Sequence, residues 1–208
     1  TECDGDMEAA TQMLREKGLA KAAARSDREN DEGTIALAVS GNTAAFVQIK
    51  TETDFSAKNE AVTGLANSIA EAVLVDGMSA VEAHASALED LQVTIKENIA
   101  LGSVERIEAA EGNILDTYLH RQDGRGVNAV IVEAAGVGQD ELHQVALHIA
   151  FAKPTYLSSD EVPADEIEKE RNSLLEITKA EGKPEQAWEK IVDGRLRGWF
   201  GERVLLEQ

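Results

Sequence analysis

Apolar residues near the start of the chain follow helical spacing. They recur at intervals of three or four and fall near one face of a helix, as Met7, Ala10, Met13 and Leu14. Gly18 follows them and is suited to end that helix as a C-cap. From residue 21 to 32 the chain is rich in alanine and charge and has no large apolar residue. This stretch is typical of a solvated helix or a linker.

The period changes at Gly33, where apolar and polar residues begin to alternate. Ile35, Leu37 and Val39 are two apart, Gly41-Asn42 supplies turn residues, and residues 46–49 resume a strand-like run. The pattern predicts a β-hairpin.

Two helical stretches are predicted after this hairpin. The first has apolar residues at three- and four-residue spacing, namely Leu65, Ile69, Ala72 and Val73. The second covers Val81 to Asn98 and turns three residues inward, namely Leu88, Leu91 and Ile95.

The same plan then repeats about 80 residues later along the chain. Glu111-Gly112-Asn113-Ile114 corresponds to Glu32-Gly33-Thr34-Ile35, and each string opens a strand, a glycine-containing turn and a second strand. The second copy continues through a strand at 127–132 into an amphipathic helix at 141–152. The sequence therefore predicts an α+β fold of two repeated hairpin-and-helix subdomains with antiparallel sheets.

The last quarter of the chain reads as two helices. Pro163 suits the first turn of a helix running to about Ala180, residues 182–184 (Gly-Lys-Pro) break it, and a second helix runs to about Phe200. This is an antiparallel helical hairpin, expected to project as an arm. The predicted domains are residues 1–31, 32–111, 112–152 and 153–208.

The net charge of the chain indicates which class of macromolecule it binds. The 208 residues include 39 acids and 20 bases, for a net charge of −19, without any basic run. Nucleic-acid binders neutralise phosphates with Lys and Arg, so direct binding of RNA or DNA is not expected, and a protein with a basic surface is the better partner. No apolar run reaches the roughly 18 residues that span a membrane. Cys3 is the only cysteine, which fits a cytoplasmic location.

The spacing of the candidate residues does not match that of metal-binding or dinucleotide-binding motifs. His143 and His148 are five apart and so lie about 140° apart on a helix, on different faces. Gly136-Val137-Gly138 begins like a dinucleotide fingerprint, but Glu141 stands where the third glycine belongs and would repel a pyrophosphate. No P-loop pattern occurs. We therefore expect no catalytic residue, no cofactor and no metal, and a nucleotide-binding enzyme with a pocket at 136–138 is the weakest hypothesis.

Asp54 and Phe55 lie at a corner between a strand and a helix and allow two interpretations. In the first, Phe55 packs in the core and Asp54 is an N-cap, which periodicity alone favours. In the second, Phe55 is exposed on a rigid corner and inserts into a pocket of a partner. Composition does not decide between them.

The string from Thr53 to Asn59, T-D-F-S-A-K-N, resembles the T-D-F-V-A-[KR]-N signature of the elongation factor Ts family. Further matches keep the family's order along nearly the whole chain. They are Gly5-Asp6 through Gly18, Ala20–Ala23, Ile95–Ile99, Tyr118–His120, His148–Ala150 with Lys153-Pro154, Gly182–Pro184 and Lys190–Leu196.

The resemblance implies a function in translation elongation. Members of this family bind the GTPase EF-Tu in its GDP form and speed GDP release by disturbing the Mg²⁺ and phosphate site, without catalytic chemistry of their own. Asp54 and Phe55, with Thr53 beside them, match the residues that push between helices of the GTPase domain. Ile95 and His120 match further contacts with EF-Tu.

The same resemblance assigns roles to the rest of the chain. Residues 1–31 match the end of an N-terminal helical, UBA-like domain and its linker. Residues 153–208 match an arm that some members use for self-association. Family members of this layout continue beyond residue 208, so the subdomain at 112–152 is expected to be incomplete.

Two residues depart from the family pattern. Ser56 replaces the usual apolar residue after the phenylalanine, which is expected to loosen packing behind Phe55. Lys96 replaces a common glycine, which puts the neighbouring contact in doubt. An alternative function follows, in which the chain binds EF-Tu without promoting exchange.

Overall fold

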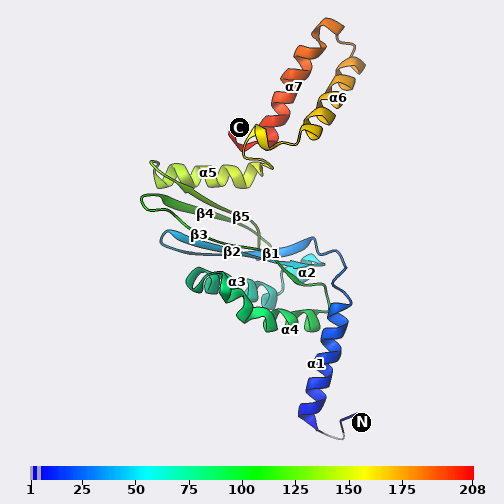
Figure 1. Ribbon diagram of the computed structural model, residues 1–208, viewed down its shortest axis with the longest axis vertical. Coiled ribbons are helices and arrows are strands. Elements are labelled where there is room, and N and C mark those ends of the chain that lie inside the picture. Colours follow the sequence, from blue (N-terminus) through cyan, green and yellow to red (C-terminus); the bar gives the residue numbers. More distant parts are fainter. Residues whose placement is uncertain (1, 4–5) are drawn as a thin grey trace. The chain divides into compact units, whose positions relative to one another are not determined.

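Five antiparallel strands form one sheet in the order β3-β2-β1-β5-β4 (Figure 1). The computed structural model describes residues 2–3 and 6–208. Seven α-helices accompany the sheet within these residues. The predicted α+β class is therefore confirmed. The strands are β1 Glu32–Ser40, β2 Thr43–Thr51, β3 Ala100–Glu108, β4 Ile114–Gln122 and β5 Arg125–Ala134.

The strands of both predicted subdomains belong to this one sheet, where the sequence predicted separate sheets. Strand β1 of the first hairpin pairs with β5 of the second, at Ile35 and Gly126. Apolar periodicity identifies the strands of each hairpin, but it does not specify which free edges meet. In this sheet the open end of the first hairpin, near Glu32, lies next to the turn end of the second hairpin, near Arg125.

Both hairpins turn at residues suited to tight turns. Gly41 has φ of +56° between β1 and β2, as the turn signal at Gly41-Asn42 predicted. Between β4 and β5, Asp123 and Gly124 have φ of +52° and +83°. Positive φ at both central residues suits the right-handed twist of a two-stranded hairpin, and Asp-Gly is a favoured pair there.

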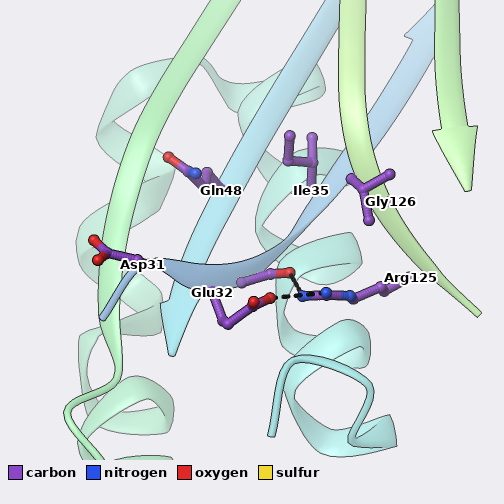
Figure 2. Close-up of a pocket in the computed structure, with 8 residues that line it drawn as sticks. Asp31, Glu32, Ile35, Gln48, Arg125 and Gly126 are labelled. Carbon is purple, nitrogen blue, oxygen red and sulfur yellow. Dashed lines mark hydrogen bonds and ion pairs between the residues drawn. The ribbon is translucent and has the colours of Figure 1, made fainter. Parts of the chain in front are cut away.

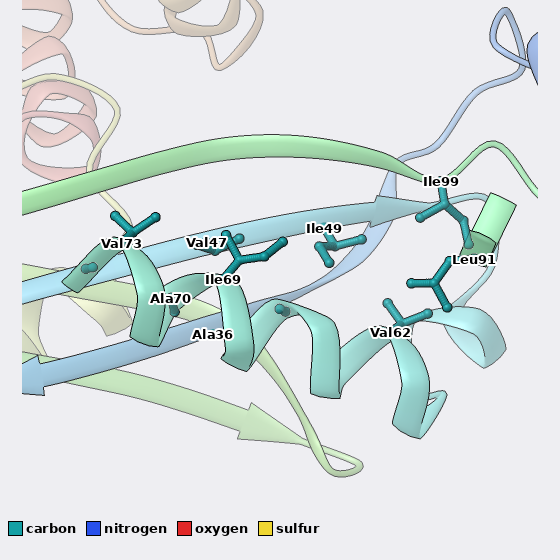
Figure 3. Packing of buried hydrophobic residues seen from close by; sticks show 11 residues of the cluster. Ala36, Val47, Ile49, Val62, Ile69, Ala70, Val73, Leu91 and Ile99 are labelled. Carbon is teal, nitrogen blue, oxygen red and sulfur yellow. The ribbon is translucent and has the colours of Figure 1, made fainter. Parts of the chain in front are cut away.

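Helix α3, Glu60–Asp76, covers one face of β1 and β2 and forms the main core (Figure 3). Its predicted inward residues Ile69 and Val73 are buried. They meet Val47 and Ile49 of β2 in a cluster that also includes Ala36, Ala45, Val62, Ala66, Ala70, Leu91 and Ile99.

The second predicted helix differs in its bounds. A 3-10 turn, Met78–His84, precedes α4, Ala85–Ile95. Leu91 is buried, and Leu88 and Ile95 pack against the core cluster, as their spacing predicted. The helix ends at Lys96 because that residue takes φ of +66° and leaves the right-handed region.

Helix α1, Met7–Ala23, packs against α4 and corrects the prediction for Gly18. The helix runs five residues beyond Gly18, so this glycine is not a C-cap. A Cβ on Gly18 would lie 2.7 Å from Cγ1 of Val93 in α4. The glycine therefore permits a close approach of two helices, a role that the local sequence does not reveal.

The chain divides into two units, one ending at Ala146 and the other comprising Leu147–Gln208. Helix α5, Gln139–Ala152, spans the boundary and confirms the predicted helix at 141–152. In the second unit α6, Ala164–Ala180, and α7, Trp188–Arg203, form the predicted helical hairpin. Gly182, at φ of +70°, lies in the break between them.

The junction of β1 and β5 requires glycine. A Cβ on Gly126 would overlap the carbonyl oxygen of Ile35, so only a hydrogen fits between the two strands. Beside it, Arg125 donates from Nη1 to the carbonyl of Gly33 at 2.6 Å and from Nη2 to the carboxylate of Glu32 at 2.8 Å. Figure 2 shows this guanidinium at a small pocket where the strands separate.

Replacing Gly126 with alanine should lower the free energy of unfolding by about 1–3 kcal/mol, because the added methyl group must push β5 away from β1. Equilibrium unfolding in urea measures the change. Gly64, in the middle of α3, is the matched control, since its Cβ would meet nothing within 4 Å. Gly64→Ala should raise the free energy of unfolding by roughly 0.5–1 kcal/mol. Equal urea midpoints for Gly126→Ala and the wild type would contradict the close approach.

Candidate functional site

Phe55 lies at the corner where β2 ends and the short helix α2, Asp54–Ala57, begins. Its side chain is 83% exposed, whereas Ser56 and Ala57 beside it are buried. A phenylalanine that served the core would be covered. The exposure therefore excludes the interpretation with Phe55 in the core, and Phe55 is a surface residue on a folded corner. Its insertion into a partner stays a prediction.

The cap of α2 is Thr53, which corrects the interpretation with Asp54 as N-cap. The Thr53 hydroxyl accepts a hydrogen bond from the backbone N–H of Ser56 at 3.2 Å. The carbonyl of Thr53 in turn accepts from the buried hydroxyl of Thr51 at 2.8 Å. Asp54 is thus left in the first helical turn, with its carboxylate available for other partners.

Glu97 binds the segment just before Phe55 through three hydrogen bonds. Its Oε2 accepts from the backbone N–H of Glu52 at 3.1 Å and of Thr53 at 3.2 Å. Its Oε1 accepts from the Thr53 hydroxyl at 2.8 Å. Bonds to a carboxylate are stronger than those between neutral groups. One side chain, 44 residues away along the chain, therefore fixes the direction in which the chain enters the corner.

Asn98 extends this support to the segment after α1. Its backbone N–H donates to Glu52 Oε1 at 2.6 Å. Its side-chain amide donates to the carbonyls of Ser26 and Arg28 at 3.0 and 2.6 Å. Sequence reasoning named Ile95 in this stretch and did not assign a role to Glu97 or Asn98. The signal that could have indicated them is the run of three polar residues, Lys96 to Asn98, between Ile95 and Ile99.

Lys58 joins the corner to the end of the second hairpin. Its ammonium lies 2.7 Å from the carboxylate of Asp54 and 3.2 Å from that of Asp123. The hydrogen bond from Lys58 holds the pKa of Asp54 below its usual value, and the positive charge of Arg125 contributes. Both carboxylates, in turn, raise the pKa of Lys58.

His120 lies at the end of β4, three residues before Asp123. It is exposed and stacks with Tyr118, the ring centroids being 6.3 Å apart. Because Lys58 contacts Asp123, the hairpin end that carries His120 is connected to the corner that carries Phe55. The structure thus brings the regions of Thr53, Asp54, Phe55 and His120 together.

Ile95 and Lys96 lie at the other side of the corner, at the end of α4. Ile95 is half-buried and packs against the core cluster, so less of it than of Phe55 is open to a partner. Lys96 has left-handed backbone geometry, which favours the glycine common in the family and costs about 1–2 kcal/mol with a side chain. Ser56 is 7% exposed, and its backbone N–H belongs to the Thr53 cap.

The residues considered for metals and nucleotides have other partners. His143 contacts Asp116 at 2.7 Å, and His148 contacts Gln208 at 2.7 Å. Within residues 2–3 and 6–208, no group of three or more potential ligand side chains could hold a metal ion. The segment 136–138 forms the turn between β5 and α5, with φ of +71° at Gly136. None of the helices in the described part of the chain is long and apolar enough to cross a membrane.

Comparison with known proteins gives one family. The family model described as Elongation factor TS matches residues 52–208. The chain is 43% identical to Elongation factor Ts of Cutibacterium acnes over 218 residues, covering all of this chain and 79% of that protein. It is 39% identical to the protein of the same name from Clavibacter michiganensis, covering all of this chain and 78% of that protein.

Replacing Lys58 with methionine should raise the pKa of Asp54, because the hydrogen bond and attraction that lower it are removed. Carboxyl NMR titration measures the change. The folded pKa of Asp54 lies below the unfolded one, so the pair stabilises the fold above the unfolded value near 3.8. This contribution is lost as pH falls through the folded value, and the stability difference between wild type and Lys58→Met should shrink there.

Lys183→Met, an exposed change in the break between α6 and α7, is the control and should leave the pKa of Asp54 unchanged. An Asp54 titration that is identical in Lys58→Met and wild type would rule out the pairing.

Proposed function

Because this chain belongs to the elongation factor Ts family, it is a translation elongation factor, and we propose that it acts as the guanine-nucleotide exchange factor of EF-Tu. In this proposal it binds EF-Tu carrying GDP and promotes release of the nucleotide. It makes and breaks no covalent bond, so it is not an enzyme in its own right. One observation carries the proposal: Phe55 is 83% exposed at a corner fixed by hydrogen bonds.

Burial of the exposed Phe55 ring in EF-Tu contributes to the free energy of binding. Complete burial of a phenylalanine side chain contributes about 1.5–3 kcal/mol. Each well-formed hydrogen bond from the corner adds roughly 0.5–1.5 kcal/mol. A thousandfold acceleration of GDP release requires about 4 kcal/mol of differential stabilisation. One inserted ring with two or three polar contacts, from Asp54 or Thr53 for example, is therefore sufficient in magnitude.

The energy must favour the nucleotide-free state of the GTPase over the GDP-bound state, because equal binding to both shifts nothing. An inserted ring meets this condition when it fits only between helices that have moved apart. Mg²⁺ requires near-octahedral coordination, so a small displacement of its ligands weakens the metal and, with it, the bound GDP. Reciprocity then requires that GDP weakens the binding of the exchange factor by the same factor.

The hydrogen bonds of Glu97 make the insertion efficient. A side chain that is already held in its binding position loses less conformational freedom when it binds. Glu97 fixes the backbone of Glu52 and Thr53, immediately before Phe55. Lys58 restrains Asp54 from the other side. The ring is thus presented from a backbone with few alternatives, which supports its function as a wedge.

The remaining contacts are proposed on the same grounds. His120 lies on the hairpin end joined to the corner through Lys58 and Asp123, and is proposed to meet a second region of EF-Tu. Ile95 is proposed to contribute its exposed part. Self-association through residues 153–208 is a further proposal, supported by a groove of about 360 Å³ between α6 and α7 with apolar residues Leu175, Trp188 and Val192 in its lining.

Phe55→Ala should slow the catalysed release of GDP by about 10- to 100-fold, since it removes about 1.5–3 kcal/mol of insertion energy. The measurement loads EF-Tu with a fluorescent GDP analogue and follows its release at increasing concentrations of this protein. Phe151→Ala is the matched control, because Phe151 on α5 is 90% exposed and lies outside the corner. It should differ from the wild type by less than about twofold.

The outcomes separate the hypotheses. Wild-type protein that co-migrates with EF-Tu without faster GDP release would identify a binding fragment that lacks exchange activity. Wild-type protein that neither binds EF-Tu nor speeds release would refute the proposed function. Equal activity of Phe55→Ala and wild type would remove Phe55 from the mechanism.

Glu97→Ala should reduce exchange by about 10-fold while Phe55 itself is unchanged, because the three hydrogen bonds that fix the corner are lost. A merely local stability effect predicts a lower urea midpoint with a normal exchange rate. A positioning role predicts slow exchange under conditions where the variant is fully folded, as checked by circular dichroism. The control is Glu105→Ala, an acid of similar charge on β3.

A further inference from the structure

One arginine, Arg125, joins the second hairpin to the first at the end that carries His120. Its guanidinium donates from Nη1 to the carbonyl of Gly33 at 2.6 Å and from Nη2 to the carboxylate of Glu32 at 2.8 Å (Figure 2). The side chain is 13% exposed, and its Nε is buried without a hydrogen-bond partner in the described part of the chain. These two bonds to β1 therefore determine where the guanidinium lies.

The strand ladder between the two hairpins is too short to fix this end by itself. Strands β1 and β5 share one register pair, Ile35 with Gly126, whereas β1 and β2 pair along their full lengths. The side-chain amide of Asn42 donates to the carbonyl of Asn113 and so holds the open end of the second hairpin against the turn of the first. The turn end of the second hairpin, at the opposite end of its strands, depends on side-chain contacts of its own.

The position of Arg125 is transmitted to His120 through the ladder of β4 and β5. Arg125 pairs directly with Gln122, two residues after His120. The turn between the strands is the tight Asp123-Gly124 pair, so the two strands move together at this end. The register shifts between His120 and Arg121, and a bulge of this kind turns the side chain beside it. The hydrogen bonds of Arg125 therefore set the direction of the exposed His120 ring.

We propose that Arg125 is a positioning residue for nucleotide exchange, which holds His120 at the separation from Phe55 that the GTPase requires; this rests on the proposed function. Two contacts on one rigid frame engage a partner together, and a flexible connection between them weakens the pair, because the second contact must be ordered on binding. The wedge is fixed independently, since Glu97 holds the backbone before Phe55. Loss of Arg125 therefore weakens the binding of EF-Tu more than it slows the maximal rate of exchange.

Arg125 has a second effect, which is electrostatic and distinct from positioning. After the hydrogen bond from Lys58, the positive charge of Arg125 contributes to holding the pKa of Asp54 below its usual value. A lysine at position 125 keeps this charge, but its ammonium lacks the planar fork by which a guanidinium donates to two acceptors in fixed directions. Arg125→Lys therefore retains the electrostatic effect and loses the positioning.

The test compares Arg125→Met with Arg106→Met in the release of a fluorescent GDP analogue from EF-Tu, after circular dichroism has verified folding. Arg106 is the matched control, because it also donates to one carbonyl and one carboxylate, those of Leu74 and Glu108, but lies on β3 at the far edge of the sheet. Arg125→Met should raise the concentration for half-maximal exchange about 10-fold at a nearly unchanged maximal rate, whereas Arg106→Met should leave that concentration within about twofold of the wild type.

A double-mutant cycle identifies His120 as the group that Arg125 positions. His120→Ala should raise the half-maximal concentration in the wild type and have little further effect in Arg125→Met, because the misplaced ring no longer contributes. Phe55→Ala should slow exchange by the same factor in both backgrounds. Arg125→Lys should raise the half-maximal concentration at least about threefold, since one ammonium does not replace the fork.

Three results would overturn the proposal. The first is an equal half-maximal concentration for Arg125→Met and Arg106→Met, and the second is independent effects of Arg125→Met and His120→Ala. The third is wild-type behaviour of Arg125→Lys, which would assign Arg125 an effect through charge alone. If Arg125→Met does not fold, Arg125→Lys is compared with Arg106→Lys in the same way. Wild-type protein that does not accelerate GDP release would instead refute the exchange function.

Discussion

Glu97 and Asn98 together hold three segments in one arrangement. The carboxylate of Glu97 accepts hydrogen bonds from two backbone N–H groups and one hydroxyl at the end of β2. Its neighbour Asn98 binds the segment that follows α1. The Thr53 cap, the start of α2 and the exposure of Phe55 all follow from that arrangement. An exposed aromatic ring is useful to a partner only when its backbone is fixed, and here a polar contact rather than the core fixes it.

The five-stranded sheet determines which of the candidate contact residues lie close together. Gly126 allows β5 to approach β1 closely, and Arg125 fills the place where the strands separate. The turn of the second hairpin then lies within reach of Lys58. Residues far apart in the sequence, such as Phe55 and His120, become parts of one connected surface region. A translation elongation factor of this family therefore uses a joined sheet as a rigid frame and places its candidate contacts at the frame's edge.

Local features of the fold could be predicted from the sequence, and long-range ones could not. The turn at Gly41, the apolar face of α3 and the break at Gly182 follow from residues close together in the chain. The joining of the hairpins depends on a contact between Ile35 and Gly126, which periodicity does not encode. The corner shows the same limit, because a phenylalanine after a strand has the same pattern whether buried or exposed. The family string indicated Phe55, whereas Glu97 acts across 44 residues and became visible only in three dimensions. The domain bounds at residues 31, 111 and 152 stay predictions.

Lys58 lies between two acids, and this has a consequence for any partner that seeks Asp54. A donor from outside that takes Oδ2 of Asp54 displaces the ammonium that already binds this oxygen. Lys58 keeps Asp123 when it is displaced, and its charge is never left without a counterion. The Lys58 ammonium thus keeps Asp54 ordered in the free protein. In the complex a donor of the partner can replace it at little cost, because Lys58 retains its contact with Asp123.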